Sequence, residues 1–296
     1  MRESVEPARN PLQPCDASPV EPREVAAAIG VAFVGRMEHG ESGGAFEVRT
    51  ADGTRAVLKL STGDVLDLAV PTALVDAVRA RGYPAPATLA MGAVDGTRYE
   101  IQEQLAGEPM EQLTPALLPQ VLALNALQRG IGAMGRGPWI DEMVSTILVG
   151  RVGYCEHGAM AEHSDETREL LARVFRIADG ARGLRVSDTD TVHYDFSPYN
   201  VLTDGNRVTG VVDWNGATNG DASFDLVTLA FYTHDAAVRS ELLGAAVAQT
   251  DPDAVVLYAA HMALRSVDWA IRNHQEFEVQ WFLGISTDLL AAVGAG

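Results

Sequence analysis

The sequence predicts an α+β protein of two lobes: a smaller N-terminal lobe built on a five-stranded antiparallel sheet with one helix, and a larger, mainly helical C-terminal lobe. Three observations lead to this prediction. The first hundred residues hold five short apolar runs separated by turn residues, a pattern typical of antiparallel strands. Most of the remaining chain repeats its apolar residues at helical spacing. With 296 residues and 47% hydrophobic content, the chain can bury two cores.

The N-terminal lobe is expected at residues 1–104. Its first part, 1–17, carries three prolines and little apolar pattern, which indicates a loose arm. A helix is predicted over 19–29, because a serine and a proline precede an apolar run that ends at Gly30. The other predicted elements of this lobe are strands at about 31–38, 45–50 and 55–60, a helix over about 71–81 that ends before Gly82, and strands at about 87–94 and 97–104.

The C-terminal lobe is expected at residues 105–296, after a glycine and a proline at positions 107 and 109 interrupt the last strand. Helical periodicity predicts helices over about 113–129, 139–158 and 165–179, and again within 221–294. Residues 189–214 are predicted to form short strands and loops. They include a hairpin whose turn is Asp204-Gly205-Asn206.

One stretch of this second lobe carries side chains suited to phosphoryl transfer. Residues 193–200 have the order His-Tyr-Asp-Phe-Ser-Pro-Tyr-Asn, and Asp213 follows thirteen residues after Asn200. Phosphoryl transfer needs one carboxylate that accepts a hydroxyl proton, together with an amide oxygen and a second carboxylate that bind the bridging metal. Asp195, Asn200 and Asp213 fit these three functions. Because isolated motifs are weak evidence, a surface Asp195 that caps a turn is the alternative.

Lysine usage gives a second indication. Lys59 is the only lysine among 22 basic residues, and it lies in the apolar strand predicted at 55–60. In so arginine-rich a chain, we expect a lysine where a planar guanidinium cannot replace a compact charge. A strand position that binds phosphate is such a place. Just upstream, Gly43 and Gly44 are predicted to let the backbone approach the phosphates, with Ser42 donating from its side chain or its backbone, although such glycines also form ordinary turns.

The order of these features resembles the protein-kinase-like fold, and more closely the aminoglycoside phosphotransferase and choline kinase family. The resemblance covers roughly residues 30–230. It rests on His193-x-Asp195-x-x-Pro198-x-Asn200-Val201-Leu202 and Val211-Val212-Asp213-Trp214, with Gly220-Asp221 and Asp225-Leu226 just beyond. It implies a bilobal kinase-like fold that binds ATP and Mg²⁺, with GTP as the open alternative to ATP.

The same resemblance assigns functions to single residues. Asp195 is the implied catalytic base, and Asn200 and Asp213 are the implied metal ligands. Lys59 is expected to bind the α- and β-phosphates, and the backbone of Glu103 and Leu105 to contact adenine. His193 is expected to brace the loop that carries Asp195, and Asp225 to brace the fold.

Three positions depart from the pattern of that family. Tyr194 stands where relatives commonly have glycine, and Asn215 stands where an acidic residue is frequent. The helix predicted at 71–81 lacks the glutamate that relatives place beside the strand lysine, so that Asp76, or Asp67 just before the helix, are the only carboxylates in range.

The formal net charge of −18 argues against a nucleic-acid partner and favours a cationic substrate or simple solubility. The substrate is expected to be a small cationic hydroxylated molecule, an aminoglycoside or a basic peptide antibiotic. Two alternatives stay open: a metabolic kinase for an amino alcohol, a choline-like molecule or a sugar, and a nucleotide-binding module without activity. The substrate-binding candidates are Tyr194, Asp235, Asp268, Trp269 and Glu276, each of which also fits an ordinary structural position.

Other features are less specific. Cys15 and Cys155 are isolated, so that neither a disulfide framework nor a zinc site is expected. The charged start of the chain lacks an apolar targeting segment, and no run reaches the length of a membrane span. We therefore expect a cytoplasmic protein without a membrane partner, present as a monomer or a homodimer.

Overall fold

The computed structural model describes residues 20–37, 45–61, 69–132, 139–151 and 153–294, which fall into two compact units. The sheet unit consists of Pro14–Gly135 and Asp188–Ala245, and the helical unit chiefly of Arg136–Ser187 and Ala246–Gly296. The predicted arm at 1–17 and the predicted phosphate-contacting residues Ser42, Gly43 and Gly44 lie outside the described residues. The lobe boundary proposed between residues 104 and 105 stays a prediction.

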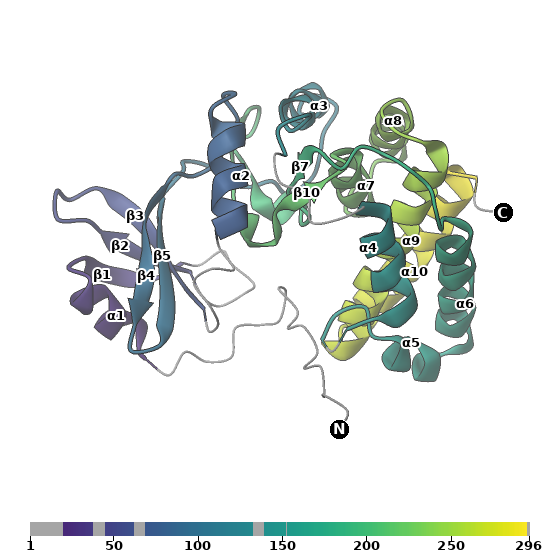
Figure 1. The fold of residues 1–296 in the computed structure, drawn as a ribbon, viewed down its shortest axis with the longest axis horizontal. Coiled ribbons are helices and arrows are strands. Elements are labelled where there is room, and N and C mark those ends of the chain that lie inside the picture. The colour runs from purple at the N-terminus through teal and green to yellow at the C-terminus, as the bar shows by residue number, and fades with distance from the viewer. Residues whose placement is uncertain (1–19, 38–44, 62–68, 133–138, 152, 295–296) are drawn as a thin grey trace. The chain divides into compact units, whose positions relative to one another are not determined.

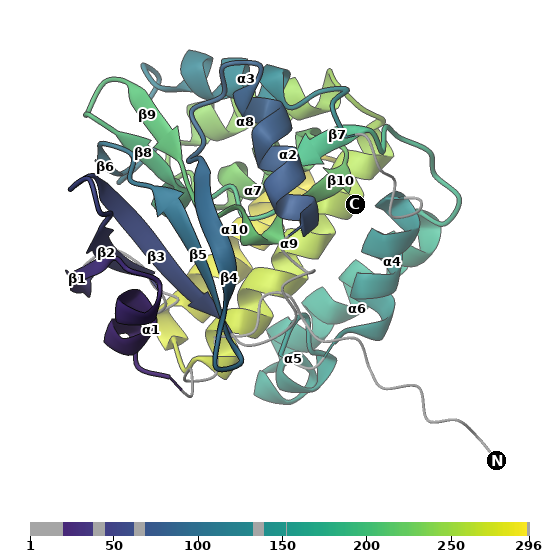
Figure 2. The same ribbon diagram turned by 60° about the vertical axis from the view of Figure 1, so that its left-hand side comes forward.

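The sheet unit contains the five-stranded antiparallel sheet that the sequence predicts, so the predicted fold class is confirmed. The strand order is β1-β2-β3-β5-β4 (Figure 2). The strands are β1 (Ala32–Arg36), β2 (Ala45–Arg49), β3 (Arg55–Ser61), β4 (Thr88–Val94) and β5 (Thr97–Glu103). Strand β3, which carries Lys59, pairs with β2 on one side and with β5 on the other.

The two faces of this sheet differ. One face buries Leu58 and Leu60 of β3 and Ile101 of β5 in an apolar cluster with Val25 and Ala26 of helix α1 (Pro22–Ala28), which lies against β1 (Figure 1). Because side chains alternate along a strand, Lys59 and its cross-strand neighbour Glu100 belong to the opposite face. The sheet therefore presents a polar face next to an apolar core.

The other elements of the sheet unit are short strands and helices. Helix α2 (Ala69–Arg79) corresponds to the helix predicted at 71–81. Strand Val201–Thr203 (β8) pairs antiparallel with Val208–Val211 (β9), which confirms the predicted hairpin. The remaining elements are β6 (Glu108–Pro109), α3 (Leu118–Leu127), β7 (Asp190–Val192), the 3-10 turns η2 (Pro198–Asn200) and η3 (Trp214–Gly216), β10 (Thr218–Gly220), α7 (Ser223–Phe231) and α8 (Ala236–Val247).

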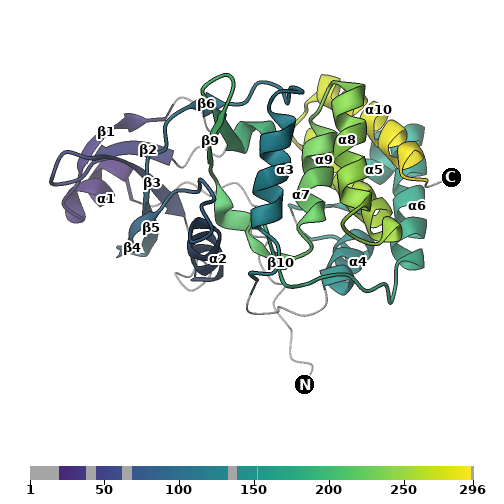
Figure 3. The ribbon, with the colours of Figure 1, turned by 90° about the horizontal axis from the view of Figure 1, so that it is seen from above.

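The helical unit is arranged around α9 (Pro252–Arg272), which contacts the four other helices that the structure describes in this unit (Figure 3). These are α4 (Trp139–Val149), α5 (His157–His163), α6 (Asp165–Gly180) and α10 (Glu276–Ala292). The single helix predicted over 139–158 is wrong. The chain breaks between α4 and α5, because Gly150, Gly153 and Cys155 all adopt positive φ, which a helix does not allow.

No helix in the described ranges is long and apolar enough to cross a membrane. Cys155 is buried, and burial raises the pKa of its thiol well above the usual value, so that the reactive thiolate is disfavoured.

A buried histidine is a notable feature of the helical unit. His261 of α9 is fully buried, and its Nε2 lies 3.1 Å from the hydroxyl oxygen of Tyr154. Burial, together with the smaller effect of the guanidinium groups of Arg265 and Arg151, lowers the pKa of His261 to about 3. The imidazole is therefore neutral in the folded protein at every pH at which the fold is commonly studied.

This difference from the unfolded chain, in which histidine has a pKa of about 6.5, predicts a pH dependence of stability. Between the two pKa values, His261 binds a proton in the unfolded chain but not in the folded protein. Its contribution to the free energy of unfolding is therefore complete above pH ~6.5 and is lost as the pH falls below that value. The loss is at most about 1.4 kcal/mol per pH unit. We expect His261→Gln to flatten this slope in urea unfolding between pH 7 and 5. His274→Asn, an exposed control, should leave it unchanged. Equal slopes for His261→Gln and the wild type would contradict the expectation.

Candidate active site

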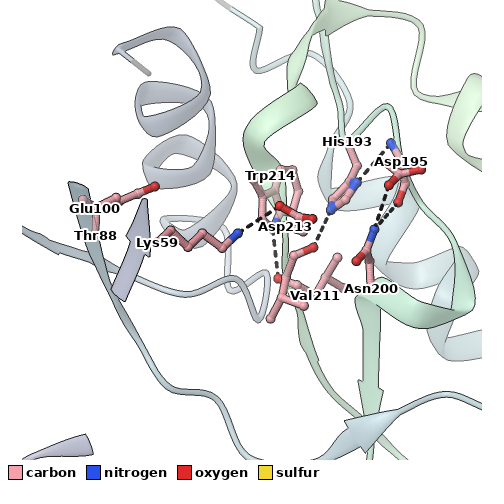
Figure 4. Close-up of polar contacts among 10 residues, drawn as sticks. Lys59, Thr88, Glu100, His193, Asp195, Asn200, Val211, Asp213 and Trp214 are labelled. Carbon is pink, nitrogen blue, oxygen red and sulfur yellow. Dashed lines mark hydrogen bonds and ion pairs between the residues drawn. The ribbon is translucent and has the colours of Figure 1, made fainter. Parts of the chain in front are cut away.

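The loop after β7 brings Asp195 and Asn200 together (Figure 4). The side-chain amide of Asn200 donates to the backbone oxygen of Asp195 at 2.8 Å and to its carboxylate Oδ2 at 3.2 Å. The short turn η2, in which the Asn200 N–H donates to the Ser197 carbonyl at 3.1 Å, returns the asparagine to the aspartate. Both amide contacts use Asn200 Nδ2, so the carbonyl oxygen Oδ1 is left to bind another group.

Asp213 lies at the end of the β8–β9 hairpin, beside the same loop. The Val212 N–H donates to the Asn200 carbonyl at 2.9 Å, which holds the residue before Asp213 against Asn200. Asp213 itself has φ 64° and ψ 57°, a left-handed conformation that costs a non-glycine residue about 1–2 kcal/mol. Strain of this kind is frequent where a side chain is held for function.

The only lysine of the chain reaches this carboxylate. Lys59 Nζ lies 2.9 Å from Asp213 Oδ1, although the two residues are 154 positions apart in the sequence. The ammonium group of Lys59 lowers the pKa of Asp213, which opposes the effect of burial. Lysine, carboxylate and amide thus converge within one unit, as the order of motifs predicts.

His193 braces this arrangement. Its ring is buried between Trp214, with centroids 4.5 Å apart, and Phe196, at 5.9 Å. The Asp195 N–H donates to His193 Nδ1 at 3.3 Å, so that Nε2 carries the proton and donates to the Val212 carbonyl at 2.9 Å. One ring therefore links the Asp195 loop to the residue before Asp213.

A second brace comes from Asp225 at the start of α7. Its carboxylate accepts the N–H of His193 at 2.8 Å, the N–H of Tyr194 at 3.0 Å and the side-chain amide of Gln128 at 2.6 Å. Asp225 is fully buried, and this burial raises its pKa. The bracing expected for Asp225 from the sequence is therefore directed at the loop that carries Asp195.

Tyr194 explains one departure from the family pattern. Its φ is 74°, a left-handed value at which glycine has no steric cost, so the glycine of relatives suits this backbone. Here the ring of Tyr194 packs on Phe224, with centroids 5.3 Å apart. A contact between Tyr194 and a substrate stays a prediction.

The other predicted site residues occupy varied positions. Glu103, the last residue of β5, accepts from Arg79 and from the Ala87 N–H, each at 3.2 Å, and Leu105 follows shortly after. Asp235 accepts the N–H groups of Ala237 and Val238, so it caps α8. The adenine contacts predicted for Glu103 and Leu105, and the substrate contact predicted for Asp235, stay predictions.

Three further substrate-binding candidates lie in the helical unit. Asp268 is buried and forms two hydrogen bonds with Arg272, at 3.0 and 2.9 Å. Trp269 is 38% exposed. Glu276 Oε1 lies 3.8 Å from His163 Nε2. Their predicted substrate contacts are not tested by these positions.

The sequence did not point to one aromatic pair. Tyr199, which precedes Asn200, is 58% exposed, and its ring meets that of Tyr232 at 6.1 Å. A tyrosine next to a predicted metal ligand was the available signal in the sequence.

Comparison with known proteins identifies the family. Residues 35–258 match the Phosphotransferase enzyme family, APH, and the chain belongs to this family. The predicted resemblance is thereby confirmed, and the chain is a phosphotransferase by family.

Individual relatives agree with this assignment. A curated relative, the hygromycin-B 4-O-kinase of Escherichia coli, is 44% identical over 41 residues, which are 14% of this chain and only 12% of that protein. Among solved structures, a thermostable mutant of aminoglycoside phosphotransferase APH(4)-Ia is similar with a TM-score of 0.66 and 19% identity, covering 91% of this chain and 98% of that one. Choline kinase LicA from Streptococcus pneumoniae has a TM-score of 0.59 and 12% identity, covering 93% and 97%. At these identities the structures establish the protein-kinase-like fold.

Proposed function

We propose that this chain transfers the γ-phosphoryl group of ATP to a hydroxyl group of a small cationic antibiotic, an aminoglycoside or a basic peptide, and so confers resistance. The observation that carries the proposal is the convergence of the catalytic groups: Asn200 donates to Asp195 at 2.8 and 3.2 Å, and Lys59 lies 2.9 Å from Asp213. Family membership supplies the reaction type.

In this proposal Asp195 accepts the proton of the acceptor hydroxyl as the hydroxyl oxygen bonds to the γ-phosphorus. The bond from that phosphorus to the β–γ bridging oxygen breaks, and ADP leaves. Proton acceptance contributes about 10²–10⁴-fold in rate, and orientation of the hydroxyl contributes more. The bonds from Asn200 hold Asp195 for both tasks. Lys59 stabilises negative charge on the phosphates.

The donor set of the site fits Mg²⁺. Asn200 Oδ1 and the carboxylate of Asp213 are hard oxygen ligands, which Mg²⁺ takes one or two at a time while phosphate oxygens and water complete its shell. Within the described ranges no group of three or more His, Cys, Asp and Glu side chains is placed to bind a metal. A site with few protein ligands suits a metal that arrives with the nucleotide. When bound, Mg²⁺ neutralises phosphate charge.

Three lines of support favour a cationic acceptor. The chain carries a formal charge of −18, which attracts cations. A solved structure of APH(4)-Ia, with a TM-score of 0.64 to this chain, is a ternary complex with ADP and hygromycin B. Tyr199, which precedes Asn200, forms an aromatic pair with Tyr232, and cationic groups bind aromatic faces with about 0.5–2 kcal/mol.

A second candidate function is a metabolic kinase for an amino alcohol, a choline-like molecule or a sugar. The similarity to choline kinase LicA favours it, since a quaternary ammonium acceptor would also suit an acidic, aromatic surface. A nucleotide-binding module without activity is a weaker alternative, because Lys59, Asp195, Asn200 and Asp213 are all retained.

The experiment that separates these functions measures ADP release by the purified chain. ATP or GTP, with and without Mg²⁺, is combined with hygromycin B, other aminoglycosides, basic peptide antibiotics, choline and sugars. We expect Mg²⁺-dependent turnover with ATP and at least one antibiotic, and growth of expressing cells on that antibiotic. Turnover with choline or a sugar alone would establish the metabolic kinase. Nucleotide binding without consumption of any acceptor would establish the binding module.

A further inference from the structure

In this structure the carboxylate partner of Lys59 is a predicted metal ligand. Its ammonium group is bonded to Asp213, which the proposed function assigns to the metal. A carboxylate that binds a divalent cation attracts an ammonium group less, because the cation neutralises it. A second carboxylate would then help to keep the ammonium group of this flexible side chain in place for the phosphates.

The helix next to the sheet does not supply that carboxylate. Helix α2 contains a single acidic residue, Asp76, and its side chain is exposed. The neighbouring positions Val75 and Val78 are the buried ones, so that Asp76 points away from the packed side of the helix. Asp67, the other acidic residue considered from the sequence, lies outside the described residues.

Strand β5 does supply one. Lys59 and Glu100 are directly opposite in the antiparallel ladder of β3 and β5, and side chains in such pairs share a face with Cβ atoms about 4.5–5.5 Å apart. The adjacent pair on that face, Ser61 and Arg98, makes a hydrogen bond of 3.0 Å, so cross-strand contacts form here. In Figure 4, Lys59 and Glu100 leave neighbouring strands toward the same side.

Glu100 is also buried. Only 5% of the residue is exposed, and its Oε1 accepts the hydroxyl hydrogen bond of Thr88 at 2.7 Å. It lines a small pocket with residues of α2 and with Trp214, which follows Asp213. A buried carboxylate with one neutral donor gains more from a cation than an exposed one does. Arg98 on the same face is engaged with Ser61, and Lys59 is the residue directly opposite Glu100.

From this geometry we propose that Glu100 is the positioning residue of Lys59: it holds the ammonium group over the polar face of the sheet once Asp213 is occupied, and thereby replaces a helix carboxylate. This proposal rests on the proposed function only in that Lys59 is taken to bind the nucleotide phosphates. The contact between Lys59 and Glu100 depends only on the pairing of β3 with β5. Thr88, by its hydrogen bond, orients Glu100 for this contact.

Because Lys59 is the only lysine, protein labelled with ¹³C at lysine Cε gives a single side-chain resonance that reports this contact without any nucleotide. In an Asp213→Asn background, which weakens the present ion pair, we expect Glu100→Gln to shift that resonance clearly. Asp76→Asn in the same background is the matched control and should leave it in place. Glu100→Gln keeps the size of the side chain and an oxygen for Thr88, so it should remain folded. A resonance that responds to Asp76→Asn and not to Glu100→Gln would overturn the proposal.

Turnover gives a second readout. In the wild-type background Glu100→Gln should lower kcat/KM for ATP about tenfold or more, the effect of losing a charge-assisted hydrogen bond. In a Lys59→Met background the same change should have no further effect, whereas a purely structural Glu100 would lower both backgrounds equally. Absence of ATP turnover by the wild type would refute the proposed function. The lysine resonance would still decide on Glu100.

Discussion

Asp195→Asn is expected to lower kcat between about 10²- and 10⁴-fold, the usual contribution of a general base, and to leave nucleotide affinity nearly unchanged. The substitution preserves the size of the side chain and one oxygen that can accept the hydrogen bond from Asn200. The loop should therefore stay in place, and the lost capacity is that of taking up the acceptor's proton. Removing a negative charge near the phosphates should, if it changes binding, tighten it slightly.

Two measurements check this expectation. Steady-state ADP release gives kcat, and calorimetric titration with AMP-PNP and Mg²⁺ gives the dissociation constant of the nucleotide. Asp204→Asn is the matched control: Asp204 lies exposed in the β8–β9 turn, where its carboxylate accepts the Arg207 N–H at 3.1 Å, and asparagine can do the same. Asp195→Asn with near-normal kcat would remove Asp195 from the mechanism. A parallel loss of nucleotide binding would assign it to structure instead.

The sequence predicted the fold well where local patterns decide the structure. The five strands follow from short apolar runs bounded by turns, and the β8–β9 hairpin from the turn Asp204-Gly205-Asn206. The predicted helix at 139–158 failed, because its helical spacing of apolar residues continues across Gly150, Gly153 and Cys155. Gly150 and Gly153 were the available signals of a helix end, and the positive φ at all three positions shows the break.

The candidate site could be predicted where residue types and their order in the sequence indicate the chemistry. Asp195, Asn200 and Asp213 follow from one short spacing, and Lys59 from its rarity. Glu100 did not follow, because its relation to Lys59 depends on the register of β3 against β5. A register is decided by the packing of a whole sheet, and no local signal in β5 marks Glu100 as different from Glu103.

Asp225 is intermediate between these cases. Its place before an apolar helix indicated a bracing function, but its partners could not be predicted, since the Asp225 carboxylate meets the N–H groups of His193 and Tyr194 from 32 and 31 residues away. A glycine at position 194 would adopt this left-handed φ without the steric cost that Tyr194 pays. The hydrogen bonds from the N–H groups of residues 193 and 194 to Asp225 therefore matter more in this chain than in one with glycine at that position.

Asp225→Ala is accordingly expected to have the largest effect on stability. The substitution leaves three donors, two backbone N–H groups and the amide of Gln128, without their acceptor in a buried site. Each unsatisfied donor costs about 1–3 kcal/mol, and removing a carboxylate whose ionisation is opposed by burial recovers part of this loss. We expect the free energy of unfolding to fall by about 3–5 kcal/mol, measured by urea denaturation at pH 7.

The same change should also reduce turnover per folded molecule, because Asp195 follows directly after the two residues that lose their anchor, and a displacement of about 1 Å can lower the rate about 10²-fold. Asp225→Asn retains one acceptor oxygen and should lie between Asp225→Ala and the wild type in both measurements. Asp251→Ala is the control for lost stability alone: it removes the cap of α9, at a cost of about 1 kcal/mol, from a position in the helical unit. If Asp225→Ala lowered stability but matched Asp251→Ala in turnover per folded molecule, Asp225 would brace the fold without positioning Asp195.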